Sequence, residues 1–190
     1  AARLRVTPNL VRRSIPFNAE ADSLNCAVLA PDVEPGDEEF DLFVKEVARE
    51  MTVKAGQKCT AIRRTIVPRR HLVDSVRMGS LASHGQRDDV NEKIAELRQR
   101  AELVYGGEAG FAPLGEGTGE GAFVAPTVLL ARDPLRNAAV HEIEAFGPVT
   151  TLMPYDDDLD EALALAARGQ GSLVGTLATK TPAIAARFVP

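Results

Sequence analysis

The 190-residue chain has only two cysteines, Cys26 and Cys59, and no tryptophan. One possible bridge in a chain of this size argues against a secreted disulfide scaffold. Its three histidines, His71, His84 and His141, lack the close spacing of zinc ligands, so no metal site is expected. No apolar run approaches the roughly 18 residues of a membrane span, and the first residues contain no signal-peptide core. We therefore expect a cytoplasmic protein with no membrane partner.

Positive charge is also in short supply. The 22 lysines and arginines are outnumbered by 27 acidic residues, giving a formal net charge of −5. A phosphate backbone would find no overall electrostatic attraction, so nucleic acid is not an expected partner. Hydrophobic residues make up 45% of the chain, which is enough to close one core.

Apolar patterning predicts alternating strands and helices. Residues 23–29 read as a buried strand, and an amphipathic helix is expected from Glu38 to Ala55 and Gly56, with Val44 on its apolar face. Further strands are predicted at residues 61–67, 103–105 and 123–130, after Pro148, and at 172–178, with further helices at 85–101, 158–168 and from 181. This alternation predicts an α/β fold with a largely parallel sheet flanked by helices.

Cys59 is the first candidate for chemistry. It follows the predicted helix and precedes the strand at 61–67, in the sequence Ala-Gly-Gln-Lys-Cys-Thr. A cysteine is a nucleophile as its thiolate, which nearby positive charge and backbone N–H groups stabilise. Lys54 and Lys58 are positioned in the sequence to supply that charge. A small core residue at a strand start is the alternative, since free cysteines are often buried.

Glu20 lies at the boundary before the strand at 23–29. A carboxylate beside an apolar pocket can serve as a general base. Asp22 competes for that role, and a solvated turn is the alternative for both.

Residues 142–149, Glu-Ile-Glu-Ala-Phe-Gly-Pro-Val, place an acidic pair before an aromatic ring and a turn. A carboxylate such as Glu144 can accept hydrogen bonds from a ribose diol, and Phe146 can cover a flat heterocycle. The alternative is a helix end with a phenylalanine in the core.

In this order the three segments resemble motifs of the aldehyde dehydrogenase superfamily. Residues 20–25 (Glu-Ala-Asp-Ser-Leu-Asn) are similar to its general-base motif, residues 55–60 to its nucleophile motif, and residues 144–149 to its coenzyme-ribose motif. The resemblance implies an aldehyde dehydrogenase-like catalytic domain. It also implies Cys59 and Glu20 as catalytic residues, and Glu144 and Phe146 as coenzyme-binding residues.

Residues 15–17, 20–25, 50–52, 54–64 and 144–149 are similar to one subgroup in particular. This is the dehydrogenase half of the bifunctional phenylacetate-degradation protein of bacteria. The resemblance implies oxidation of a CoA-linked semialdehyde with NADP, or with NAD, beside a fused hydratase. A sister group, the dehydroadipyl-CoA semialdehyde dehydrogenases of benzoate degradation, shares much of the pattern and is the alternative. Family members are usually dimers or larger, so a homo-oligomer is implied.

The resemblance assigns residues 1–19 to the end of a coenzyme-binding domain and its hinge, and residues 20–190 to part of the catalytic domain. The family normally has a helix and a Gly-Asp-Pro loop where residues 76 and 77 adjoin here, so a stretch is expected to be missing. Most of the coenzyme site is absent from the chain, and the chain alone is expected to be inactive. Two alternative hypotheses for the function remain. The chain is a packing or oligomerising module, or it is a coenzyme-independent, thioesterase-like enzyme that uses Cys59.

Overall fold

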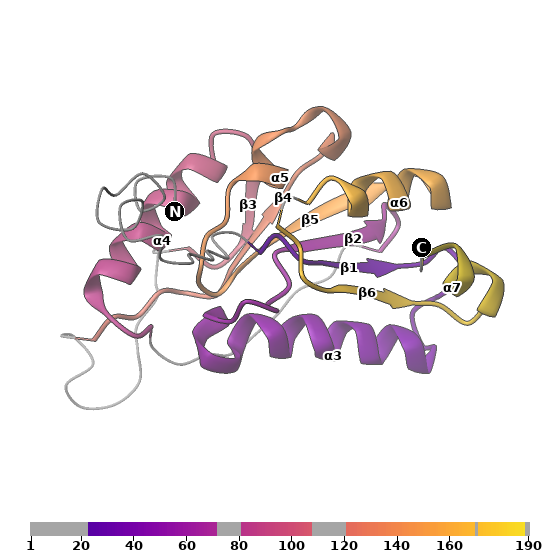
Figure 1. The fold of residues 1–190 in the computed structure, drawn as a ribbon, viewed down its shortest axis with the longest axis horizontal. Helices are drawn as coiled ribbons and strands as arrows, with labels where there is room; N and C mark the ends of the chain where they lie inside the picture. The colour runs from indigo at the N-terminus through magenta and orange to yellow at the C-terminus, as the bar shows by residue number, and fades with distance from the viewer. Residues whose placement is uncertain (1–22, 72–80, 108–120, 170, 189–190) are drawn as a thin grey trace, which may run out of the picture.

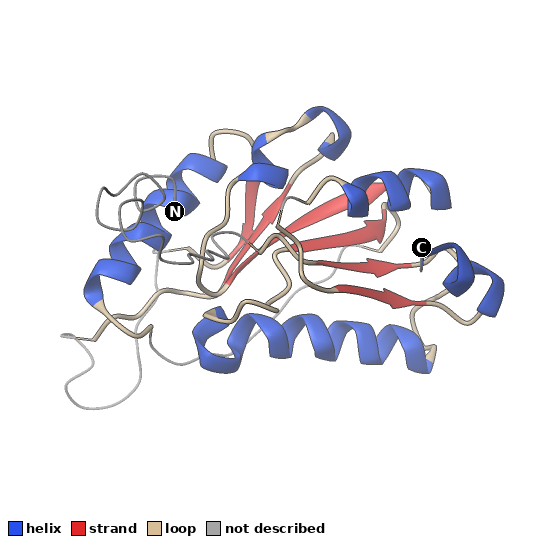
Figure 2. Ribbon diagram, viewed as in Figure 1, coloured by secondary structure: helices blue, strands red, loops and turns tan. Residues whose placement is uncertain are grey.

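The computed structural model describes residues 23–71, 81–107, 121–169 and 171–188. These residues form a six-stranded sheet in the order β3-β4-β5-β2-β1-β6, with helices on both faces (Figure 1, Figure 2). The strands are β1 (Cys26–Leu29), β2 (Arg64–Pro68), β3 (Glu102–Tyr105), β4 (Thr127–Leu130), β5 (Val149–Tyr155) and β6 (Gly175–Ala178). The α-helices are α3 (Glu38–Thr52), α4 (His84–Leu97), α5 (Ala139–Glu142), α6 (Leu159–Ala167) and α7 (Pro182–Phe188). Short 3-10 helices are η1 (Val53–Gly56) and η3 (Pro134–Arg136).

The sheet is parallel except at one edge. β1 pairs in parallel with β2 and β6, and β5 pairs in parallel with β2 and β4. Among the described strands, β3 alone runs antiparallel, against β4, with an irregularity between Leu103 and Tyr105. The predicted α/β fold with a largely parallel sheet is therefore confirmed, while the reversed edge strand was not foreseen.

Side-chain alternation along the strands divides the core into two layers. In β1, Ala27 and Leu29 pack with Phe40 and Phe43 of α3, whereas Val28 belongs to a larger cluster on the opposite face. That cluster includes apolar side chains of α4 and α6. Figure 1 shows α3 along one face of the sheet and α5 and α6 along the other. Because both faces are covered there, the central strands β1, β2 and β4 are buried along their whole length, whereas β3 and β6 at the two edges are partly exposed.

The predicted helix from Glu38 is α3, which ends at Thr52, followed by η1, which ends where expected, at Gly56. Val44 is an exception, because it is 40% exposed rather than on the buried face. Four strands start later than predicted: β1 at Cys26, β2 at Arg64, β4 at Thr127 and β6 at Gly175. The residues just before these strands are buried or hydrogen-bonded in loops. An apolar run can therefore begin before the residues that pair in the sheet.

A membrane-spanning helix is absent from the part of the chain that the structure describes, since no helix there is both long and apolar enough.

Arg64 is the largest fully buried side chain, at 0% exposure. Its guanidinium donates hydrogen bonds to the carbonyls of Leu24 (2.8 Å), Leu165 (2.6 Å) and Ala166 (3.0 Å). The last two carbonyls form the C-terminal end of α6, where the helix dipole favours a cation. His141 Nδ1 lies 3.3 Å from the same guanidinium, and burial lowers the pKa of both groups. Arg64 thus joins β2 to α6 and to the segment that enters β1.

Parallel pairing brings the starts of β1, β2 and β5 to one edge of the sheet. Asn25, Arg63 and Pro148 directly precede these three strands. Side chains that lie far apart in the sequence therefore meet at this amino edge, which is where the candidate site lies.

Candidate active site

Cys59 lies in the loop between η1 and β2 and is exposed, whereas Cys26 is buried in β1 with 4% exposure. Burial raises the pKa of the Cys26 thiol, which disfavours its thiolate. The core-residue interpretation therefore applies to Cys26 and is wrong for Cys59. We call residues 56–62, which contain this candidate nucleophile, the nucleophile loop.

The nucleophile loop is entered through a left-handed backbone turn. Lys54 and Ala55 both have φ of 53°, and Gly56 has φ of 69°. A Cβ atom at Gly56 would lie 2.3 Å from the carbonyl oxygen of Gly147. Glycine is therefore required both for the conformation and for the close approach of the two loops.

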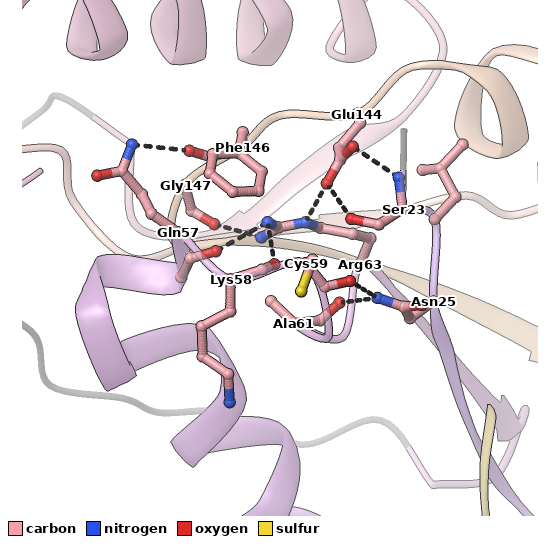
Figure 3. A network of polar contacts seen from close by, with 12 residues as sticks. Ser23, Asn25, Gln57, Lys58, Cys59, Ala61, Arg63, Glu144, Phe146 and Gly147 are labelled. Carbon is pink, nitrogen blue, oxygen red and sulfur yellow. Dashed lines mark hydrogen bonds and ion pairs between the residues drawn. The ribbon is translucent and has the colours of Figure 1, made fainter. Parts of the chain in front are cut away.

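Arg63 holds the nucleophile loop against residues 144–147 (Figure 3). Its side chain is 3% exposed, and it donates to the carbonyls of Gly147 (2.7 Å) and Gly56 (2.8 Å) and to Glu144 Oε1 (3.1 Å). The guanidinium carbon lies 5.3 Å from the centre of the Phe146 ring, within cation–π range. Burial lowers the pKa of Arg63, and the Glu144 charge opposes that shift. One buried cation thus joins the second and third motifs.

Glu144 is also bound to Ser23, within the first motif. Its Oε2 accepts from the backbone N–H of Ser23 at 2.8 Å, and Oε1 accepts from Ser23 Oγ at 2.9 Å as well as from Arg63. A carboxylate offers about four acceptor sites, so one remains for a further hydrogen-bond donor. The side chain is only 8% exposed, which restricts that site to a closely fitting partner. The structure therefore brings Cys59, Glu144 and Phe146 to one region, while Glu20 and Asp22 lie outside the described residues.

Lys58 was expected to supply positive charge to Cys59. Its Nζ instead lies 2.6 Å from both carboxylate oxygens of Glu50 at the end of α3. The expectation is corrected, because Glu50 balances the Lys58 charge.

Gln57 adds a second connection between the loops. Its Nε2 donates to the Phe146 carbonyl at 3.3 Å and to Gln86 Oε1 at 2.8 Å, and its Oε1 accepts from Ala82 N at 2.8 Å. No role was predicted from the sequence for Gln57, Arg63 or Ser23. A usable signal existed only for Arg63, since adjacent arginines in a buried apolar run require buried partners.

An apolar pocket of about 80 Å³ lies elsewhere, between α3 and the sheet. Phe40, Phe43 and Met51 of α3 line it together with Thr65 and Thr150 of the sheet. None of Cys59, Arg63, Glu144 and Phe146 lines it, so it is separate from the candidate site. Within the described ranges, no three His, Cys, Asp or Glu side chains group as metal ligands.

Residues 69–190 match the model of the aldehyde dehydrogenase family. The chain belongs to this family. The resemblance drawn from the three motifs is thereby confirmed. One relative, 3,4-dehydroadipyl-CoA semialdehyde dehydrogenase of Aromatoleum evansii, is 45% identical over 210 aligned positions that cover 100% of this chain and 41% of the relative. Protein MaoC of Klebsiella aerogenes is 45% identical over 113 positions, which cover 59% of this chain and 32% of MaoC.

Solved structures of this family share the fold. Betaine aldehyde dehydrogenase from Staphylococcus aureus, in complex with NAD+, superposes with a TM-score of 0.77 at 22% identity. The match covers 98% of this chain and 39% of that structure. The aldehyde dehydrogenase-like fold is therefore confirmed, and the chain spans less than half the length of each of these relatives.

The difference in exposure between the two cysteines predicts selective alkylation. Iodoacetamide should modify Cys59 in the native chain and reach Cys26 only after unfolding, because burial shields that sulfur and disfavours its thiolate. Mass spectrometry of the peptides containing each cysteine, with and without urea, measures this. Equal labelling of both cysteines in the native chain would contradict the assignment.

The close approach of the two loops predicts that Gly56→Ala is more destabilising than Gly36→Ala. Both glycines have positive φ, but a Cβ at Gly36 would meet nothing within 4 Å. The control should lose about 1–2 kcal/mol of the free energy of unfolding through backbone strain. Gly56→Ala should lose about 1–3 kcal/mol more through overpacking against Gly147. Urea unfolding measures both variants, and equal losses would show that the loops are not in contact.

Proposed function

We propose that this chain is part of the catalytic domain of an NAD(P)-dependent aldehyde dehydrogenase that oxidises a CoA-linked semialdehyde to the acid. The observation that carries the proposal is the network in which Arg63 joins the loop of exposed Cys59 to Glu144 and, through it, to Ser23. The substrate class is supported by the name of the Aromatoleum evansii relative. We place the enzyme in the cytoplasm as a homo-oligomer.

Within the whole enzyme, we assign residues 1–19 to the end of the coenzyme-binding domain and the hinge. Residues 20–190 are then part of the catalytic domain. The greater length of the relatives supports the view that this chain is part of a larger enzyme. The alignment to the Aromatoleum protein is longer than the chain itself, which is consistent with a stretch absent near residues 76 and 77.

In the proposed reaction the Cys59 thiolate adds to the aldehyde carbon and forms a thiohemiacetal. Exposure of Cys59 leaves the sulfur open to an incoming carbonyl. The Cys59 backbone N–H and a side-chain amide from outside this chain stabilise the oxyanion.

When bound, the nicotinamide coenzyme supplies the hydride acceptor that oxidation of the thiohemiacetal to a thioester requires. In this chain Glu144 would hold its ribose through the remaining acceptor site, and Phe146 would pack near its ring. Glu20 then removes a proton from the water that hydrolyses the thioester and releases the acid.

For the substrate we propose the semialdehyde of phenylacetate degradation, made by a hydratase fused to this enzyme. The second candidate is 3,4-dehydroadipyl-CoA semialdehyde, which the name of the Aromatoleum relative favours. Comparing kcat/KM for the two semialdehydes decides between them.

Replacement of Cys59 tests the nucleophile. Full-length protein should form NADPH or NADH when given a CoA-linked semialdehyde, and Cys59→Ser should abolish turnover because an unactivated hydroxyl is a poor nucleophile. Cys26→Ala, which removes the buried sulfur, is the matched control and should retain turnover. Full activity in Cys59→Ser would overturn the mechanism. Product formation without coenzyme would favour the thioesterase-like alternative.

Replacement of Glu20 tests the general base. In Glu20→Gln a first burst of reduced coenzyme should persist while steady-state turnover falls by about 10²–10⁴-fold, since only thioester hydrolysis needs the base. Stopped-flow absorbance separates the two phases. Asp22→Asn is the control variant, because Asp22 is the competing candidate for the general base. If steady-state turnover is lost in Asp22→Asn and not in Glu20→Gln, the base is Asp22.

A further inference from the structure

Asn25 lies directly before β1 and is 1% exposed. Its Nδ2 donates to the carbonyls of Cys59 (2.7 Å) and Ala61 (3.1 Å). Its Oδ1 accepts from the backbone N–H groups of Leu173 (2.8 Å) and Val174 (3.0 Å). Two carbonyls on one side and two N–H groups on the other fix the orientation of the amide and use its full hydrogen-bonding capacity.

The backbone of Asn25 holds the far end of the same loop. Its carbonyl accepts from the N–H groups of both Arg63 and Arg64, each at 3.1 Å. Asn25 therefore contacts the nucleophile loop at Cys59 and Ala61 and again where the loop enters β2. Figure 3 shows the amide directed at this loop, with Arg63 and Glu144 contacting each other beside it.

These contacts give Asn25 a different task from Arg63. Arg63 connects the loop to Glu144, where the ribose is proposed to bind, whereas no hydrogen bond joins the Asn25 side chain to Glu144 or Arg63 among the described residues. The Asn25 side chain acts instead on the peptide unit that carries the nucleophile. The hydrogen bond from the buried amide to the Cys59 carbonyl restrains the backbone of the residue whose sulfur is exposed.

We propose that Asn25 is a positioning residue for the nucleophile, which sets the reactive orientation of Cys59 through the Cys59 and Ala61 carbonyls. This inference rests on the proposed function only in taking Cys59 as the reacting group. A misplacement of about 1 Å at a reacting atom can cost about a hundredfold in rate, so loss of these bonds should affect kcat. The KM for the coenzyme should stay nearly unchanged, because the contacts of Glu144 are left in place.

The test uses two variants of Asn25 and one control in the full-length protein. Asn25→Asp keeps the shape but directs a carboxylate oxygen at two carbonyl oxygens, and Asn25→Ser keeps a hydroxyl too short to reach all four partners. Ser172→Ala is the matched control, because Ser172 Oγ donates to the neighbouring Leu24 carbonyl (2.6 Å), and among the described residues its hydroxyl forms no hydrogen bond with the nucleophile loop. Circular dichroism tests whether each variant is folded. If Asn25→Asp does not fold, Asn25→Ser is used to decide the proposal.

Two measurements are made on each folded variant. In steady-state kinetics, kcat should fall by about a hundredfold in the Asn25 variants and stay near wild type in Ser172→Ala, with little change in the KM for the coenzyme. In hydrogen exchange, the peptide covering residues 57–63 should exchange about tenfold faster in the Asn25 variants, as expected for two lost hydrogen bonds. The same peptide should be unaffected in Ser172→Ala.

The proposal is overturned if folded Asn25 variants keep wild-type kcat, or if kcat falls equally in Ser172→Ala. It is also overturned if residues 57–63 exchange at the wild-type rate. If wild-type protein oxidises no aldehyde at all, the proposed function fails, and the exchange of residues 57–63 still decides whether Asn25 holds the Cys59 loop.

Discussion

The buried guanidinium of Arg63 is the contact on which the amino edge of the sheet depends. A cation with 3% exposure needs compensation, and it receives this from Glu144 and from the carbonyls of Gly56 and Gly147. Removing any one partner would leave a charge or carbonyl unsatisfied in a poorly solvated place. The three motifs are therefore held together by one network, and the geometry around Cys59 depends on how well that network is satisfied.

The sequence was a good guide to the fold wherever burial alone decides structure. The apolar spacing of Phe40, Phe43 and Met51 predicted α3, because one helix face packs on the sheet. Strand starts were predicted less well, since Arg63 and the residues around it are buried by the site rather than by strand pairing. The antiparallel direction of β3 could not be predicted, because its four residues have no pattern that distinguishes a parallel from an antiparallel neighbour.

The residues of the candidate site could be predicted in part from the sequence, but their contacts could not. Motif order and residue type indicated Cys59, Glu144 and Phe146, and the structure places these residues in one region. The contacts of Asn25 and Ser23 could not be predicted, because their partners lie 34 to 149 residues away and are chosen by parallel strand pairing. The expectation for Lys58 was wrong for the same reason: proximity in sequence to Cys59 did not decide which charge Lys58 would meet. Local sequence indicated the chemical groups, and tertiary pairing decided their partners.

The second buried arginine has a consequence for how the chain folds. Arg64 donates its hydrogen bonds to carbonyls that lie 40, 101 and 102 residues away in the sequence. Until β1, β2 and α6 have all docked, a partly folded chain must either keep this guanidinium in water or bury it without partners. Intermediates with an incomplete central sheet are thereby disfavoured, and the many distant contacts make assembly slow and cooperative. A side chain with no part in the proposed chemistry thus favours cooperative folding, in which β1, β2 and α6 dock together.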